Sequence, residues 1–163
     1  MVRRAFFSFH YEKDIWRASQ IRNSWVTKED REAAGFWDAA KWEEVKRGGE
    51  AAIKKWINDQ LKGTSVTAVL IGSETVQRKY VGYEIEQSYM KNNGMLGIYI
   101  HKQKDQDKKT SKKGVNPFSR WYITRNTKKV YFTELYTTYD WVDDKGYDNL
   151  GKWIEKAAKQ AGK

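Results

Sequence analysis

Apolar residues gather in short runs along this chain, and several of the runs predict buried β-strands. The clearest are residues 65–72, "SVTAVLIG", and 95–101, "MLGIYIH", which are β-branched and apolar without alternation, as in strands covered on both faces. Residues 2–9 and 130–136 are apolar, aromatic runs that also predict strands. A shorter run, "AAGFWD", predicts a strand that ends at Asp38.

Between these runs the apolar positions change to helical spacing. Asp14 is suited to cap a helix that continues to about residue 26. Residues 50–63 carry apolar side chains at helical intervals and end on Gly63, which fits the position after a helix. Further helices are predicted over 80–94 and 147–158, whereas 39–49 predicts a loop closed by a glycine pair.

The alternation of strands and helices predicts a parallel sheet with right-handed crossovers. Five such units in this length indicate an α/β fold, a flavodoxin-like doubly wound sheet of five strands with helices on both faces. Ligands of such sheets bind outside the carboxyl ends of the strands, where the strand order reverses. The loops expected to frame a site there are 9–14 and 72–79.

Composition favours one globular domain, residues 1–163. Aromatic residues make up 15% of the chain, which is too many for a disordered segment. With no cysteine and only two histidines, a metal site is not expected. The N-terminal apolar run is too short for a signal peptide, and no stretch approaches the roughly 18 apolar residues that cross a bilayer. We therefore expect a soluble cytoplasmic protein.

The net charge of +10 is concentrated in one segment. Residues 101–129 hold ten Lys or Arg and two Asp, a net of +8, so the rest of the chain is nearly balanced. The sequence therefore indicates a basic insertion at about 102–129. It is either a solvated loop or a rim that attracts phosphate groups.

The helix predicted over 80–94 carries the best candidate for a reactive side chain. At about 100° per residue, Val81, Ile85 and Ser88 share the stripe that faces the sheet, and Glu86 points to solvent. Glu84 lies at the edge of the stripe, near the positive end of the helix dipole. We predict an ordered, half-buried carboxylate there, either catalytic or stabilising the helix.

Common nucleotide and hydrolase motifs are absent: G-x-G-x-x-G, the P-loop pattern and G-x-S-x-G do not occur. The polar residues expected at the carboxyl edge are His10, Tyr11, Asp14, Asp38, Ser73, Thr75 and Glu84. His10 and Asp38 follow predicted strands directly, although each is equally suited to a local turn or cap. Trp37 and Trp42 are candidates for stacking faces or for ordinary packing.

Several blocks of the sequence resemble, in order, a known family. "RRAFFSFHY", "IRNSWVTK", "FWDAAKWEE", "TSVTAVLIGSETVQRKYVGYEI" and "GIYIH" are similar to the TIR-like proteins of the Thoeris anti-phage defence system, the ThsB family. The similarity covers most of residues 2–102, and "YDWVDDKGYDNLGKWI" continues it near the C-terminus. It implies a TIR-like five-stranded parallel sheet, in agreement with the pattern of strands and helices.

The resemblance also implies a function. TIR enzymes cleave the nicotinamide–ribose bond of NAD, and this family converts the product into a signal nucleotide, often a cyclic ADP-ribose isomer, that activates a separate effector. Glu84 occupies the place of the TIR catalytic glutamate, and Tyr80 stands where Trp is usual. NAD is then a substrate, and no cofactor is expected.

Weaker substrate-binding assignments follow from the same resemblance. They are Phe9, His10, Tyr11, Asp38, Ser73 and Tyr80. A phage-derived trigger and a homo-oligomer are further expectations. Two alternatives remain open: a catalytically silent TIR-like assembly module that self-associates through residues 39–49, and a nucleic-acid-binding protein, which charge alone suggests.

Overall fold

The computed structural model describes residues 3–163 and has a five-stranded parallel sheet at its centre. The strand order is β2-β1-β3-β4-β7, and every neighbouring pair is parallel. This confirms the predicted flavodoxin-like order, with the reversal between β1 and β3. The sheet strands are β1 (Arg3–Ser8), β2 (Arg31–Ala33), β3 (Val66–Ile71), β4 (Gly94–Tyr99) and β7 (Thr138–Asp140).

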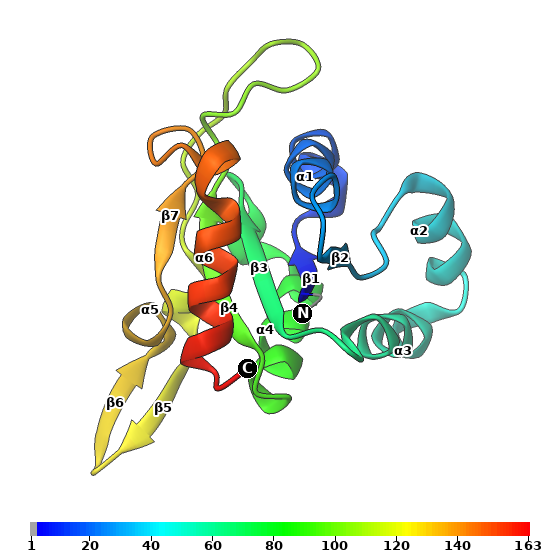
Figure 1. Ribbon diagram of the computed structural model, residues 1–163. Helices are drawn as coiled ribbons and strands as arrows, with labels where there is room; N and C mark the ends of the chain where they lie inside the picture. The colour runs from blue at the N-terminus through cyan, green and yellow to red at the C-terminus, as the bar shows by residue number, and fades with distance from the viewer. Residues whose placement is uncertain (1–2) are drawn as a thin grey trace.

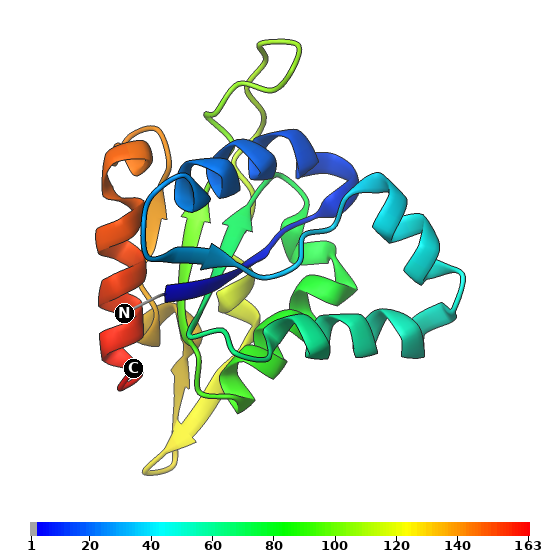
Figure 2. The same ribbon diagram turned by 45° about the vertical axis from the view of Figure 1, so that its right-hand side comes forward.

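Helices cover both faces of the sheet (Figures 1 and 2). α1 and α6 pack on one face, and α4 packs on the other with α3 beside it. The helices are α1 (Tyr11–Val26), α2 (Ala39–Lys46), α3 (Gly49–Leu61), α4 (Lys79–Met90), the short α5 (Phe132–Leu135) and α6 (Gly146–Gln160). Within the described residues, no helix is both long and apolar enough to cross a bilayer.

The predicted strands at 65–72 and 95–101 are confirmed as β3 and β4, because their side chains are covered on both faces. All six residues of β3 are buried, and five of the six in β4 are. The N-terminal run is confirmed as β1, although Val2 lies outside the described residues. The helix predicted to end at Gly63 is confirmed as α3, and Gly63 has the positive φ of 76° typical of a helix C-terminus.

Three predictions about the first half of the chain were wrong. α1 is capped by His10, whose side chain accepts from the backbone N–H of Lys13, while Asp14 lies inside the helix. The second strand is only β2 and ends five residues before Asp38. Residues 39–46 form helix α2 instead of a loop, because Asp38 caps this segment.

The prediction of a strand at 130–136 was also wrong. Its first two residues belong to β6 (Lys128–Tyr131), which pairs antiparallel with β5 (Tyr122–Arg125) in a hairpin outside the main sheet. The next four residues form α5, and the fifth strand of the sheet is β7. In Figure 1 the hairpin extends below the body of the molecule.

Candidate active site

Glu84 lies in the second turn of α4 and is enclosed by the protein. Only 2% of its surface is exposed, so the half-buried carboxylate expected from the sequence is in fact fully covered. Its Oε1 accepts a hydrogen bond of 2.7 Å from the hydroxyl of Ser8, the last residue of β1. Its Oε2 has no hydrogen-bond partner among the described residues. The carboxyl group therefore stands at the strand-order reversal with one oxygen free.

Burial raises the pKa of Glu84 from its ordinary 4.5 to about 8. The Ser8 hydroxyl, the charge of Arg78 and the side chain of Trp37 each oppose this shift, but removal of the carboxylate from water outweighs them. At neutral pH the enclosed group is therefore mostly a neutral acid. A cation placed beside Oε2 would favour its charged form.

Aromatic rings surround this part of the molecule. Trp42 of α2 lies with its ring centroid 5.5 Å from that of Tyr11 and 6.4 Å from that of Tyr80. Trp37 packs edge-on against Trp42 at 5.1 Å and stacks on Trp56 of α3 at 3.6 Å. We call these five residues the aromatic cover.

The aromatic cover ties together elements that are far apart in the sequence. Its side chains come from α1, α2, α3, α4 and the segment after β2. Arg78, directly before α4, places its guanidinium 5.0 Å from the Trp42 ring centroid. This cation adds a favourable contact with the ring and holds α2 toward α4. Large planar side chains beside a carboxyl group suit a ligand with flat rings.

The structure brings most of the predicted site residues to the same edge of the sheet. Phe9 is buried and stacks on Phe36 at 4.8 Å. His10 is half-buried at the start of α1, and burial, aided by the charge of Arg78, lowers its pKa. Tyr11 and Tyr80 belong to the aromatic cover.

Two predicted site residues are less closely associated with Glu84. Asp38 is exposed and accepts a 2.8 Å hydrogen bond from the backbone N–H of Lys41, as the N-cap of α2. Ser73 is half-buried in the loop after β3. The cap explains why an aspartate stands at position 38. A substrate contact by Asp38 or by Ser73 stays a prediction.

Ser8 and Arg78 were not predicted from the sequence as partners of Glu84. Ser8 is fully buried directly after the apolar residues 5–7 of β1, and a hydroxyl at the end of such a run was the available signal. Arg78 gave no such signal, since the chain has 31 lysines and arginines and most of them are solvated.

The basic segment 102–129 is anchored to the body of the protein instead of forming a free loop. The buried Arg17 of α1 donates to the backbone oxygens of Gln103 and Lys109, at 2.7 and 2.9 Å. Gly114 packs so closely on the backbone of Gly72 that a Cβ there would collide with the carbonyl oxygen. The segment therefore borders the loop after β3.

Asp14 is a second buried acid at this edge. It is 2% exposed, and burial raises its pKa to about 6 despite the charge of Arg17. Its carboxylate lies against Gly72, where any side chain would collide with it. Asp14, which the sequence predicted to be a helix cap, is therefore a buried acid beside the loops that border the site.

Comparison with known proteins identifies the same region. The family model for the Thoeris protein ThsB, TIR-like domain, matches residues 6–105, which run from within β1 to beyond β4 and include Glu84. A protein of Bacillus cereus (strain MSX-D12) named "Putative cyclic ADP-D-ribose synthase ThsB1" is 36% identical over 191 aligned positions. The alignment covers 94% of this chain and 100% of that relative.

Proposed function

The chain belongs to the ThsB family of Thoeris TIR-like proteins, and we propose that it cleaves NAD and makes a cyclic ADP-ribose signal. The observation that best supports the proposal is the buried Glu84, which has one oxygen free and lies near Trp37 of the aromatic cover. NAD is the substrate, and the reaction needs no further cofactor. Its product activates a separate effector protein in the cytoplasm, where NAD is made and used.

Glu84 suits the chemistry of breaking a glycosidic bond. As the bond between the ribose and nicotinamide breaks, its electrons pass to the ring nitrogen, and positive charge develops on the sugar. A carboxylate beside the ribose stabilises this charge. Nicotinamide leaves as a neutral molecule, so no general acid is needed. A nucleophilic atom of the same ADP-ribose then takes the place of nicotinamide and closes the ring.

The raised pKa of Glu84 links substrate binding to ionisation. The nicotinamide ring of NAD carries a positive charge, which lowers the pKa of a nearby carboxyl group. NAD binding therefore favours loss of the Glu84 proton, so that the charged form is produced where it is needed. For this to happen the side chains that cover Glu84 must move away, because Glu84 is only 2% exposed.

The decisive experiment measures nicotinamide release from NAD and identifies the other product by mass spectrometry. Glu84→Gln keeps the shape of the side chain and removes its charge, so we expect activity to fall by at least about a hundredfold, or about 2.7 kcal/mol in the barrier. Glu86→Gln is a matched control, because Glu86 is exposed on the same helix. Full activity in a folded Glu84→Gln protein would refute the mechanism.

The closed site also favours a second candidate, a TIR-like module that assembles without catalysis. The carboxyl group of Glu84 is buried and mostly neutral, which is compatible with a purely structural role. This candidate predicts no nicotinamide release, with or without extracts of phage-infected cells. It also predicts self-association that depends on concentration and is weakened by substitutions on the exposed face of α2. Nicotinamide release that depends on Glu84 would exclude it.

A further inference from the structure

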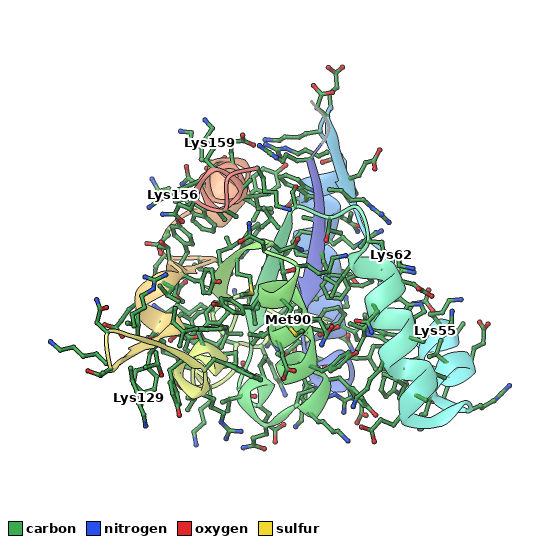
Figure 3. All side chains as sticks on the ribbon, turned by 90° about the horizontal axis from the view of Figure 1, so that it is seen from below. Lys55, Lys62, Met90, Lys129, Lys156 and Lys159 are labelled. Atoms are coloured by element: carbon green, nitrogen blue, oxygen red, sulfur yellow. The ribbon has the colours of Figure 1, made fainter. Side chains whose placement is uncertain are left out.

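A groove of about 690 Å³ runs beside the outer face of α6. It is wide open to solvent and is lined by Arg31 of β2 and by residues between 151 and 160 of α6. Figure 3 shows Lys156 and Lys159, two residues of this lining, on the side of α6 that faces away from the sheet. Because α6 and α4 pack on opposite faces of the sheet, nothing in the proposed reaction uses this groove.

The groove is lined by cations that have no acidic partner. Four such side chains form no salt bridge among the described residues: Arg31, Lys152, Lys156 and Lys159. The three lysines are exposed and stand four and three residues apart, so they share one side of the helix. At 1.5 Å per residue they form a row about 10 Å long. The row and Arg31 together present an extended positive surface.

Arg31 holds its guanidinium group against the body of the protein. Its Cζ lies 4.6 Å from the ring centroid of Trp25, a buried residue of α1. Its Nη2 lies so close to Gly151 that a Cβ added to that glycine would be only 1.9 Å away. These two contacts fix the group before any ligand arrives, so less side-chain entropy is lost on binding. A fixed planar guanidinium is suited to bind a carboxylate through two parallel hydrogen bonds.

The acids near the groove leave this positive charge largely uncompensated. Glu155 belongs to the lining, but its two oxygens accept hydrogen bonds of 2.9 Å from Nε and Nη2 of Arg3. Glu29 and Asp30 border an adjoining pocket that shares Arg31, and neither forms a salt bridge with it. An anionic occupant would therefore meet the cations without having to break an existing ion pair.

We propose that this groove docks an acidic segment of a partner protein. One carboxylate of the segment would pair with Arg31 and others with the lysines of α6, whose methylene groups would contact its apolar parts. The open shape suits an extended chain lying on the surface, since small ligands are largely enclosed by their sites. A nucleic acid fits less well, because the lining offers no aromatic side chain on which a base could stack.

Fluorescence anisotropy with a labelled peptide of alternating Glu and Ala tests the docking site. The net charge of +10 attracts any polyanion, so variants of equal charge must be compared. We expect Arg31→Gln to weaken peptide binding by about tenfold, and Lys156→Gln by about twofold because its contact is more solvated. Lys129→Gln is the matched control, since Lys129 also lacks a salt bridge but lies on the hairpin (Figure 3), and it should bind like the wild type.

Gly151→Ala separates the position of Arg31 from its charge. The added methyl group would displace the guanidinium, which is the end of a flexible side chain, so the protein should fold with every charge kept. We expect the affinity for the acidic peptide to fall by about threefold or more, because Arg31 is no longer held in place. Gly82→Ala is the control, a helical glycine of α4 whose added Cβ would meet nothing closer than 3.7 Å. Equal affinity of Gly151→Ala and wild type would overturn the proposal.

Two further probes identify the class of partner. The same peptide with Gln in place of Glu should not bind, since it has no carboxylates to pair with Arg31. A single-stranded oligo-dT should show no greater dependence on Arg31 than on Lys129. Oligo-dT binding that is tighter than peptide binding and is lost in Arg31→Gln would overturn the proposal, as would the absence of peptide binding at low salt. These measurements involve neither NAD nor catalysis, so they remain valid if the proposed function fails.

Discussion

The ionisation of the buried Glu84 carboxyl group affects both the stability of the protein and its proposed activity. The protein holds its carboxyl group in a position where only one oxygen has a donor, and that donor is Ser8. The same burial that raises its pKa makes its charged form costly. Stability and activity should therefore depend on pH in opposite directions.

Glu84→Gln should stabilise the folded protein at alkaline pH. Between pH 4.5 and about 8 the folded protein keeps a proton on Glu84 that the unfolded chain has released, so wild-type stability falls as pH rises. Glutamine has no such proton, and its advantage in the free energy of unfolding should grow by about 3 kcal/mol from pH 5 to pH 8. Urea denaturation at the two pH values measures this difference.

The exposed Glu86→Gln is the control for this measurement and should show no comparable change with pH. An equal effect of Glu84→Gln at pH 5 and pH 8 would mean that Glu84 is already ionised in the folded protein. Asp14 titrates in the same range, but it is present in every variant and its contribution cancels.

Ser8→Ala should move the pH dependence of the reaction. The Ser8 hydroxyl favours the charged form of Glu84, so its removal raises the pKa of Glu84 further. The rate of nicotinamide release at low NAD, which rises with pH as Glu84 ionises, should then rise at higher pH than in the wild type. Ser24→Ala on α1 is the control, and coincident profiles for Ser8→Ala and wild type would contradict the prediction.

At the scale of elements, α2 packs on Trp37, the member of the aromatic cover whose side chain acts on Glu84. Trp42 is its buried anchor and contacts both α1 and α4 through aromatic rings. The helix itself is short, and Trp42 is the only one of its eight residues that is buried. Apart from its packing on α3, its position therefore depends mainly on Trp42, which makes this side chain the one to test.

Trp42→Ala should admit water to Glu84 and lower the pKa of that carboxyl group, because burial is the main cause of its shift. Carbon-13 NMR titration of the glutamate carboxyl groups reports this directly and needs no substrate. Trp16→Ala is the matched control, since Trp16 is exposed on the surface of α1. An unchanged pKa in Trp42→Ala would show that other groups keep water out.

The basic segment 102–129 gives a second prediction at this scale. Arg17→Met removes the two hydrogen bonds that hold Gln103 and Lys109. Trypsin should then cleave between residues 102 and 113 about tenfold faster, because local opening becomes easier. Lys28→Met, at an exposed position after α1, should leave the cleavage rate unchanged. Equal cleavage of both variants would mean that other contacts hold the segment.

The order of the sheet could be predicted because strands buried on both faces leave a strong apolar signal, as β3 shows. Helix α2 could not be predicted, because only Trp42 of its eight residues is buried and because its start depends on the Asp38 cap. β7 has three half-buried residues and no apolar run, so the stronger pattern at 130–136 was preferred.

At the candidate site, Glu84 could be identified from the helical spacing and the family resemblance. Its complete burial could not be predicted, because Trp37 reaches it only through the folding of other elements. The pocket between the end of α4, the β5–β6 hairpin and the end of α6, at the amino edge of the sheet, left no motif at all. Its wall comes from four separate segments, and only the tertiary structure brings them together.

For the whole molecule, the two outer strands of the sheet limit how copies can join. β2 and β7 are each three residues long, so each offers few free backbone groups to another chain. Short borders of this kind oppose the addition of further strands and the growth of fibrils. Apart from the β5–β6 hairpin, the surfaces left for assembly are therefore helices and loops, where substitutions can be made without disturbing the sheet.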